Sequence, residues 1–179
     1  MSFDGLPRRV WSIPRVIDGQ ADEYRRVQAR GRLLHDRETL VQAVTGLGSG
    51  FWVLTPLRTA DGSVLLAHRH PRRQHYPDCW DGVGGHIEAG ESPEQALVRE
   101  CQEELGVTVT RWRRLAPPVT AWADDLELHP FVVDAWRGTP TNLAPDEHDD
   151  LAWIDPGTLG SLRLAHPGLV PLVTTAMSR

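Results

Sequence analysis

Short runs of apolar residues, separated by turn signals, predict a set of strands from about residue 51 onward. The first two runs flank Asp61-Gly62, a dipeptide typical of tight turns. The expected strands cover residues 51–57, 64–67, 107–115, 126–136 and 151–154, and a closing helix is expected over residues 167–177. Strands mixed with a few helices predict an α/β protein whose sheet is covered on both faces.

One helix can be placed with both of its ends. Ser92 suits the N-cap, Pro93 suits the first helical position, and Gln95 completes a capping box. Gly106 suits the left-handed conformation that follows the last turn of a helix. These signals predict a helix over residues 93–105.

The sides of this helix differ in character. Apolar residues at four-residue steps form one row that should face the core, namely Leu97, Cys101 and Leu105. Another side carries like charges at i, i+3 and i+4, which repel one another, at Glu100, Glu103 and Glu104. Arg99 stands four residues before Glu103 and can pair with it. Hard oxygen ligands of this kind suit Mg²⁺ or Mn²⁺.

Residues 85–107 carry a fixed pattern that includes this helix. It consists of Gly85, five residues, Glu91, seven residues, and then Arg99-Glu100-Cys101-Gln102-Glu103-Glu104-Leu105-Gly106-Val107. Written as G-x5-E-x7-R-E-U-x-E-E-x-G-U, with U apolar, it resembles the Nudix box. The resemblance covers about residues 50–178 and implies an α/β/α sandwich with a mixed sheet between helices. It also implies a hydrolase that cleaves a phosphoanhydride linked to a nucleoside diphosphate, with Mg²⁺ or alternatively Mn²⁺ as cofactor.

The resemblance implies the roles of the residues in the box. The implied metal ligands are the backbone carbonyl of Gly85 and the carboxylates of Glu91, Glu100, Glu103 and Glu104. The implied catalytic set is Arg99, Glu100, Glu103 and Glu104. The general base stays open among Glu100, Glu103, Glu104 and the acidic loop at residues 147–150, because its reach to a water is not visible in a sequence.

Further substrate contacts are expected from two polar loops outside the box. The basic loop at residues 68–79 offers arginines whose planar forks recognise phosphate, while Trp80 offers a ring for base stacking or for the core. The acid-rich loop offers a distal carboxylate, with a solvated surface loop as the alternative. The candidates are Arg69, Arg72, Trp80, Glu147 and Asp150.

Length and composition restrict the domain organisation, the partners and the location that can be expected for this chain. Its 179 residues fit one domain plus an extension, with residues 1–48 as an N-terminal extension without an assigned role and residues 49–179 as the Nudix domain. A net charge of −5 argues against a long nucleic-acid partner but allows a small nucleotide or diphosphate substrate. No apolar run has membrane-spanning length, and Cys79 and Cys101 do not make a disulfide framework. We therefore expect a cytoplasmic protein without a membrane partner, and the resemblance suggests a homodimer.

Several functions remain open at this point. A nucleoside triphosphate, including a damaged one such as 8-oxo-dGTP, is the first expectation for the substrate, and a nucleoside-diphosphate sugar is the second. The segments 76–81 and 84–86 loosely resemble isopentenyl-diphosphate-isomerase-like members of the same fold, although the intact R-E-x-x-E-E pattern favours hydrolysis. A non-catalytic nucleotide sensor is the third alternative, but such proteins usually carry a DNA-binding extension, and residues 1–48 show no clear helix-turn-helix pattern.

Overall fold

The computed structural model describes residues 50–121, 126–166 and 168–178. The expectation of an N-terminal extension at residues 1–48 lies outside this part of the chain. Within the described residues, no helix is both long and apolar enough to cross a membrane.

The strand β6 (Leu126–Arg137) is the centre of the first sheet. β1 (Gly50–Leu54) runs parallel to it, whereas β4 (Thr108–Arg114) and β5 (Val119–Ala121) run antiparallel to different stretches of it. The sheet is therefore mixed, as expected.

The second sheet is antiparallel, with β2 (Val64–Arg69) between β3 (Trp80–Asp81) and β7 (His148–Ile154). Its register shifts at the end of β2, where His68 faces Asp150 and Arg69 faces His148. One extra residue, Asp149, therefore lies in β7 as a β-bulge. Bulges turn side chains to new directions and are common beside active sites.

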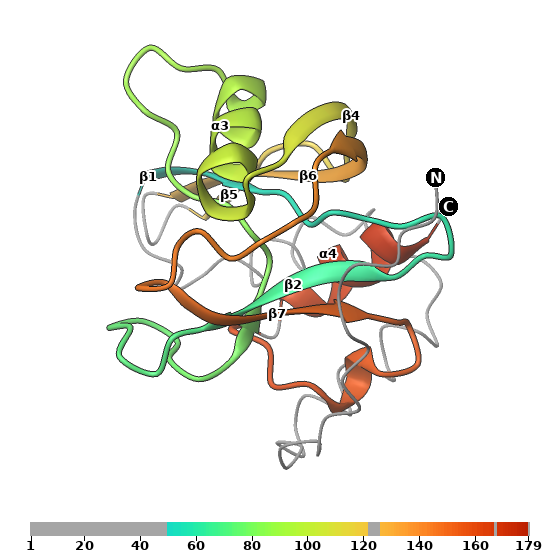
Figure 1. Ribbon diagram of the computed structural model, residues 1–179. Helices are drawn as coiled ribbons and strands as arrows, with labels where there is room; N and C mark the ends of the chain where they lie inside the picture. Colours follow the sequence, from blue (N-terminus) through green and yellow to red (C-terminus); the bar gives the residue numbers. More distant parts are fainter. Residues whose placement is uncertain (1–49, 122–125, 167, 179) are drawn as a thin grey trace.

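Two apolar layers lie on the two sides of the strands. α3 (Pro93–Leu105) contributes its row of apolar residues to one layer, and α4 (Leu169–Met177) contributes to the other. Alternate residues of β2 and β6 supply both layers, because successive side chains of a strand point to opposite faces. Figure 1 shows α3 beside β4 at the top of the view, and α4 behind β2. The residues facing α3 include Leu65, Ala67, Phe131 and Val133, and those facing α4 include Val64, Leu66 and Val132.

The elements agree with the sequence-based predictions to different degrees. The helix at residues 93–105 is confirmed at both ends, with Leu97, Cys101 and Leu105 buried as predicted. β1 ends at Leu54 instead of residue 57, since Pro56 has no N–H for the ladder. β7 begins three residues before the predicted strand, and β3, β5 and the 3₁₀ turn Leu159–Ser161 were not predicted. β3 has two residues, and β5 and the 3₁₀ turn have three each, so their patterns of apolar residues are too short to recognise in a sequence.

Candidate active site

The ends of α3 fix the register of its acidic residues. The Ser92 hydroxyl accepts a hydrogen bond from the Gln95 amide, and the Gln95 side chain accepts one from the Ser92 amide at 2.8 Å. Gly106 adopts φ 68° and closes the helix with its amide. Local sequence therefore determines which side of the helix each carboxylate occupies.

Arg99 holds the acidic side of α3 together. Its guanidinium donates to both oxygens of Glu91, at 3.0 and 2.9 Å. One of its terminal nitrogens also donates to Glu100 at 2.7 Å and to Glu103 at 3.0 Å, and the other to the His86 carbonyl at 2.8 Å. The Arg99 hydrogen bonds lower the pKa of Glu91 below its ordinary value. The predicted pair with Glu103 is thus present, within a larger network that offsets repulsion between the acids.

Glu100 and Glu104 are buried, with exposed fractions of 8% and 5%. Burial raises the pKa of both carboxyl groups, and the charge of Glu100 is the next cause that raises the pKa of Glu104, to about 9. The Oε2 atom of Glu104 is buried and finds no hydrogen-bond partner among the described residues. Glu103 differs, because its side chain is 59% exposed. Two buried carboxyl groups with raised pKa values therefore lie on the same helix as an accessible one.

The glycine loop before α3 touches these acids directly. A Cβ on Gly85 would lie 2.3 Å from Oε1 of Glu100, so only glycine allows this approach. The Gly85 carbonyl accepts a hydrogen bond from the Val53 amide at 2.9 Å. A carbonyl oxygen has two lone pairs, so one remains for another partner. The predicted carbonyl ligand therefore lies beside the predicted carboxylate ligand.

The donors at this site fit a hard divalent cation. They are carboxylate and carbonyl oxygens, and one buried carboxylate oxygen has no partner. Within residues 50–121, 126–166 and 168–178, no three His, Cys, Asp or Glu side chains gather closely enough to hold a metal by themselves. The carboxylates of Glu91, Glu100 and Glu103 form ion pairs with Arg99. This arrangement is compatible with Mg²⁺, which usually keeps several waters and is completed by substrate phosphates.

His148 belongs to this site and was not predicted from the sequence. Its Nδ1 lies 3.8 Å from Oε2 of Glu104, and both side chains are 7% exposed. Burial, together with the charges of Arg69 and Arg73, lowers the pKa of His148 to about 4. The predicted strand began at residue 151, so no sequence signal indicated the bulge that directs this side chain.

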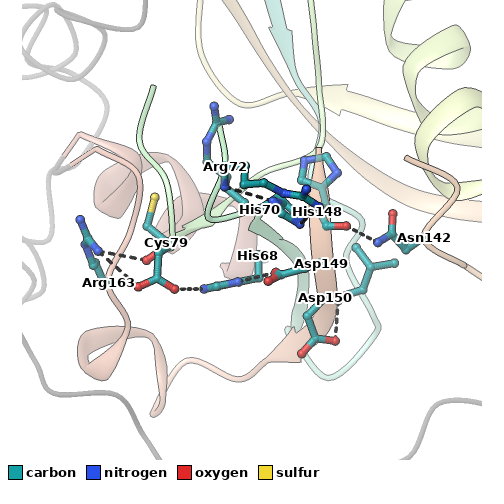
Figure 2. Close-up of polar contacts among 12 residues, drawn as sticks. His68, His70, Arg72, Cys79, Asn142, His148, Asp149, Asp150 and Arg163 are labelled. Atoms are coloured by element: carbon teal, nitrogen blue, oxygen red, sulfur yellow. Dashed lines mark hydrogen bonds and ion pairs between the residues drawn. The ribbon is translucent and has the colours of Figure 1, made fainter. Parts of the chain in front are cut away.

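Arg69 and Arg72, the arginines predicted to contact phosphate, differ in their surroundings. Arg69 donates to the carbonyls of Tyr76 and His75, at 3.0 and 2.9 Å, and to Asp81 at 3.0 Å. Its guanidinium therefore holds its own loop together. Arg72 is exposed, and its contacts are with the neighbouring His70 side chain (Figure 2). The geometry leaves Arg72 more accessible to a ligand than Arg69.

The side chains of Glu147 and Asp150, both in the acidic loop, point in different directions. Glu147 forms an ion pair with Arg73 at 3.0 Å, and its charge contributes to the raised pKa of Glu104. Figure 2 shows Asp150 pointing away from His148, with its carboxylate accepting from the Leu151 amide. The structure therefore brings Glu147 toward the acids of α3 and leaves Asp150 away from them.

Trp80 packs in the core on the α4 side, with an exposed fraction of 9%. Its ring makes an edge contact with His68, at 5.0 Å between ring centroids. His68 in turn pairs with Asp149 at 2.6 Å and with Asp78 at 3.6 Å (Figure 2). This burial gives no support to a base-stacking role for Trp80.

Comparisons with known proteins agree with this fold and site. The sequence matches the family model of the NUDIX domain over residues 48–174. CTP pyrophosphohydrolase of Escherichia coli (strain K12) is 34% identical over 127 residues, covering 70% of this chain and 90% of that protein. The 8-oxo-dGTP diphosphatase of Proteus vulgaris is 38% identical over 80 residues, covering 44% of this chain and 70% of that protein. The chain belongs to the Nudix family and is a pyrophosphohydrolase.

Solved structures share the fold. The solution structure of the E. coli ORF135 protein matches with a TM-score of 0.56 and 28% identity, over 73% of this chain and 91% of that one. A MutT structure, from work on Aliivibrio salmonicida and Vibrio cholerae, matches with a TM-score of 0.55 and 28% identity, over 64% and 86% of the two chains. The expected α/β class with the Nudix fold is thereby confirmed.

Proposed function

We propose that this pyrophosphohydrolase acts on a nucleoside triphosphate and depends on Mg²⁺, or on Mn²⁺ in its place. Water cleaves the phosphoanhydride bond between the α- and β-phosphates, so the products are a nucleoside monophosphate and pyrophosphate. The observation that carries the proposal is the buried pair Glu100 and Glu104 against the Gly85 backbone, with one carboxylate oxygen unpartnered. Support for the substrate comes from relatives whose names specify CTP, 8-oxo-dGTP or nucleoside triphosphates.

In this proposal each group of the site has a definite task. Glu100, Glu104 and the Gly85 carbonyl would hold the cation, and Glu91 and Glu103, which pair with Arg99, would complete its surroundings. The bound cation supplies positive charge that offsets charge developing on the phosphate oxygens. One carboxylate of the acidic set accepts the proton of the attacking water. Arg99 keeps these carboxylates oriented, and the exposed Arg72 would contact the phosphate chain.

A substrate panel tests the proposal. The products of each substrate would be separated and quantified by anion-exchange chromatography, after incubation with Mg²⁺ and with EDTA. The panel would contain CTP, 8-oxo-dGTP, the common nucleoside triphosphates, nucleoside-diphosphate sugars, dinucleoside polyphosphates and prenyl diphosphates. We expect the highest kcat/KM with a nucleoside triphosphate and no turnover in EDTA.

Other results would lead to different conclusions. A preference for a nucleoside-diphosphate sugar would overturn the triphosphate assignment but keep the chemistry. Conversion of isopentenyl diphosphate without phosphate release would identify an isomerase. A folded protein that binds nucleotide, shifts DNA and hydrolyses nothing would be a sensor.

A further inference from the structure

Glu104 lies beside an imidazole that comes from outside the box. Oε2 of Glu104 is buried without a hydrogen-bond partner, and Nδ1 of His148 lies 3.8 Å from it. This separation is longer than a hydrogen bond and shorter than the roughly 5.5 Å that an intervening water needs. A movement of about 1 Å would therefore convert the near contact into a direct hydrogen bond.

The backbone around His148 is held from both sides. Its amide donates to the Ala144 carbonyl at 2.9 Å, and its carbonyl accepts from the Asn142 side chain, as Figure 2 shows. Asn142 also accepts from the Ala144 amide at 3.1 Å, which closes the turn. The bulge at Asp149 then brings His148 opposite Arg69, on the side of β7 that faces α3. These contacts aim the imidazole at Glu104.

An imidazole donor suits a place beside a cation site. A neutral imidazole donates a hydrogen bond without adding a positive charge that would repel a divalent cation. Partners of this kind commonly orient the ligands of a metal.

We propose that His148 is a positioning residue, which donates a hydrogen bond from Nδ1 to Oε2 of Glu104 and thereby directs the other carboxylate oxygen toward the cation. The inference rests on the proposed metal site and extends it to a residue outside the Nudix box. His148 touches neither the substrate nor the cation in this arrangement.

Mn²⁺ binding to the full chain without nucleotide tests this role by isothermal titration calorimetry. His148→Leu removes the donor, and we expect the Mn²⁺ Kd to rise about tenfold or more. His148→Asn places an amide donor near the position of Nδ1, so it should restore most of the affinity. His148→Gln places its donor farther out and should restore less. A Kd for His148→Leu equal to that of the wild type would overturn the proposal.

A second buried histidine provides a matched control. His129 is 7% exposed and pairs with Glu127 at 2.7 Å, so His129→Leu also removes a buried histidine–carboxylate contact. We expect His129→Leu to alter thermal stability but to leave the Mn²⁺ Kd within about twofold, since it is not part of the proposed cation site. If His148→Leu does not fold, the Asn and Gln variants carry the test, and equal Kd values for these two would overturn the proposal.

Titration of Glu104→Gln with Mn²⁺ tests the proposed metal site separately from the proposed role of His148. Wild-type Mn²⁺ binding by Glu104→Gln would show that the proposed metal site is wrong. Weak binding by Glu104→Gln together with unchanged binding by His148→Leu would show that only the role of His148 is wrong. If both roles are correct, the double variant should bind Mn²⁺ no more weakly than Glu104→Gln alone.

Discussion

Among single residues, Arg99 makes the largest set of contacts with the acids of the site. Its planar guanidinium reaches Glu91, Glu100 and Glu103 at once. A lysine carries the same charge but is a point charge without a fork. Arg99→Lys should therefore misplace the carboxylates and reduce kcat by about a hundredfold, because small errors in the position of reacting groups are costly. Steady-state kinetics with saturating Mg²⁺ would measure this.

The matched control for Arg99→Lys is another arginine that pairs with α3. Arg114 contacts Glu94 in the first turn of the helix and lies over the Phe131 ring at 4.7 Å. Arg114→Lys should keep kcat within about twofold, since exposed pairs of this kind contribute little. Equal kcat values for Arg99→Lys and the wild type would contradict the organising role of Arg99.

The cysteines provide a prediction about pH. Cys79 and Cys101 are buried, and burial raises the pKa of their thiols to about 11 and about 12. Because only the thiolate reacts, less than about 1% of either thiol is reactive at pH 8. Alkylation by iodoacetamide should be slow in the folded protein at pH 8 and faster as the pH rises toward 11, whereas both thiols should react promptly in urea. A thiol that reacts equally fast in both states at pH 8 would disprove this environment.

At the scale of elements, the glycine loop and α3 act as one unit. Gly85→Ala would bring a methyl group against Oε1 of Glu100, which Arg99 holds in place. We expect the fold to persist, because the clash is with the end of a side chain, and kcat to fall by about a hundredfold as Glu100 is displaced. Thermal unfolding and kinetics of the same preparation would separate these effects.

Gly157→Ala provides the control for this loop. A Cβ at Gly157 would lie 3.0 Å from Oδ1 of Asp155, so the change also places a methyl group beside a carboxylate, but outside the site. Its activity should match that of the wild type. If Gly85→Ala and Gly157→Ala were equally active, the close approach at Gly85 would have no role in catalysis.

Elements also differ in how well sequence predicts them. The ends of α3 depend on Ser92, Gln95 and Gly106, which act within a few residues, so the helix and its acidic side were predictable. The bulge in β7 depends on its pairing with β2, about 80 residues earlier in the chain. His148 was therefore missed, although its neighbours in the acidic loop were named. Arg69 was named from its position, but its contacts with its own loop depend on how residues 75–81 fold.

In the whole molecule, the site lies where separate parts of the chain meet. α3 supplies the acids, the loop after β3 supplies Gly85, and the bulged end of β7 supplies His148. The layer of apolar residues between α3 and the strands holds these parts together. The Nudix box includes α3 and Gly85. His148 lies outside the box and reaches the site only through the fold. We therefore expect hydrolysis to depend on the buried carboxylate of Glu104.

The most direct test of this central claim compares the wild type with Glu104→Gln. Pyrophosphate and nucleoside monophosphate would be measured from CTP and 8-oxo-dGTP, with Mg²⁺ and with EDTA. We predict that the wild type forms the two products in equal amounts with Mg²⁺ and forms neither in EDTA. Turnover by Glu104→Gln should be lower by at least about a hundredfold, while its melting temperature should not fall. The same comparison with Glu103→Gln would examine the exposed member of the acidic set. Wild-type turnover by both variants would contradict the assignment of the box carboxylates as the hydrolytic metal site.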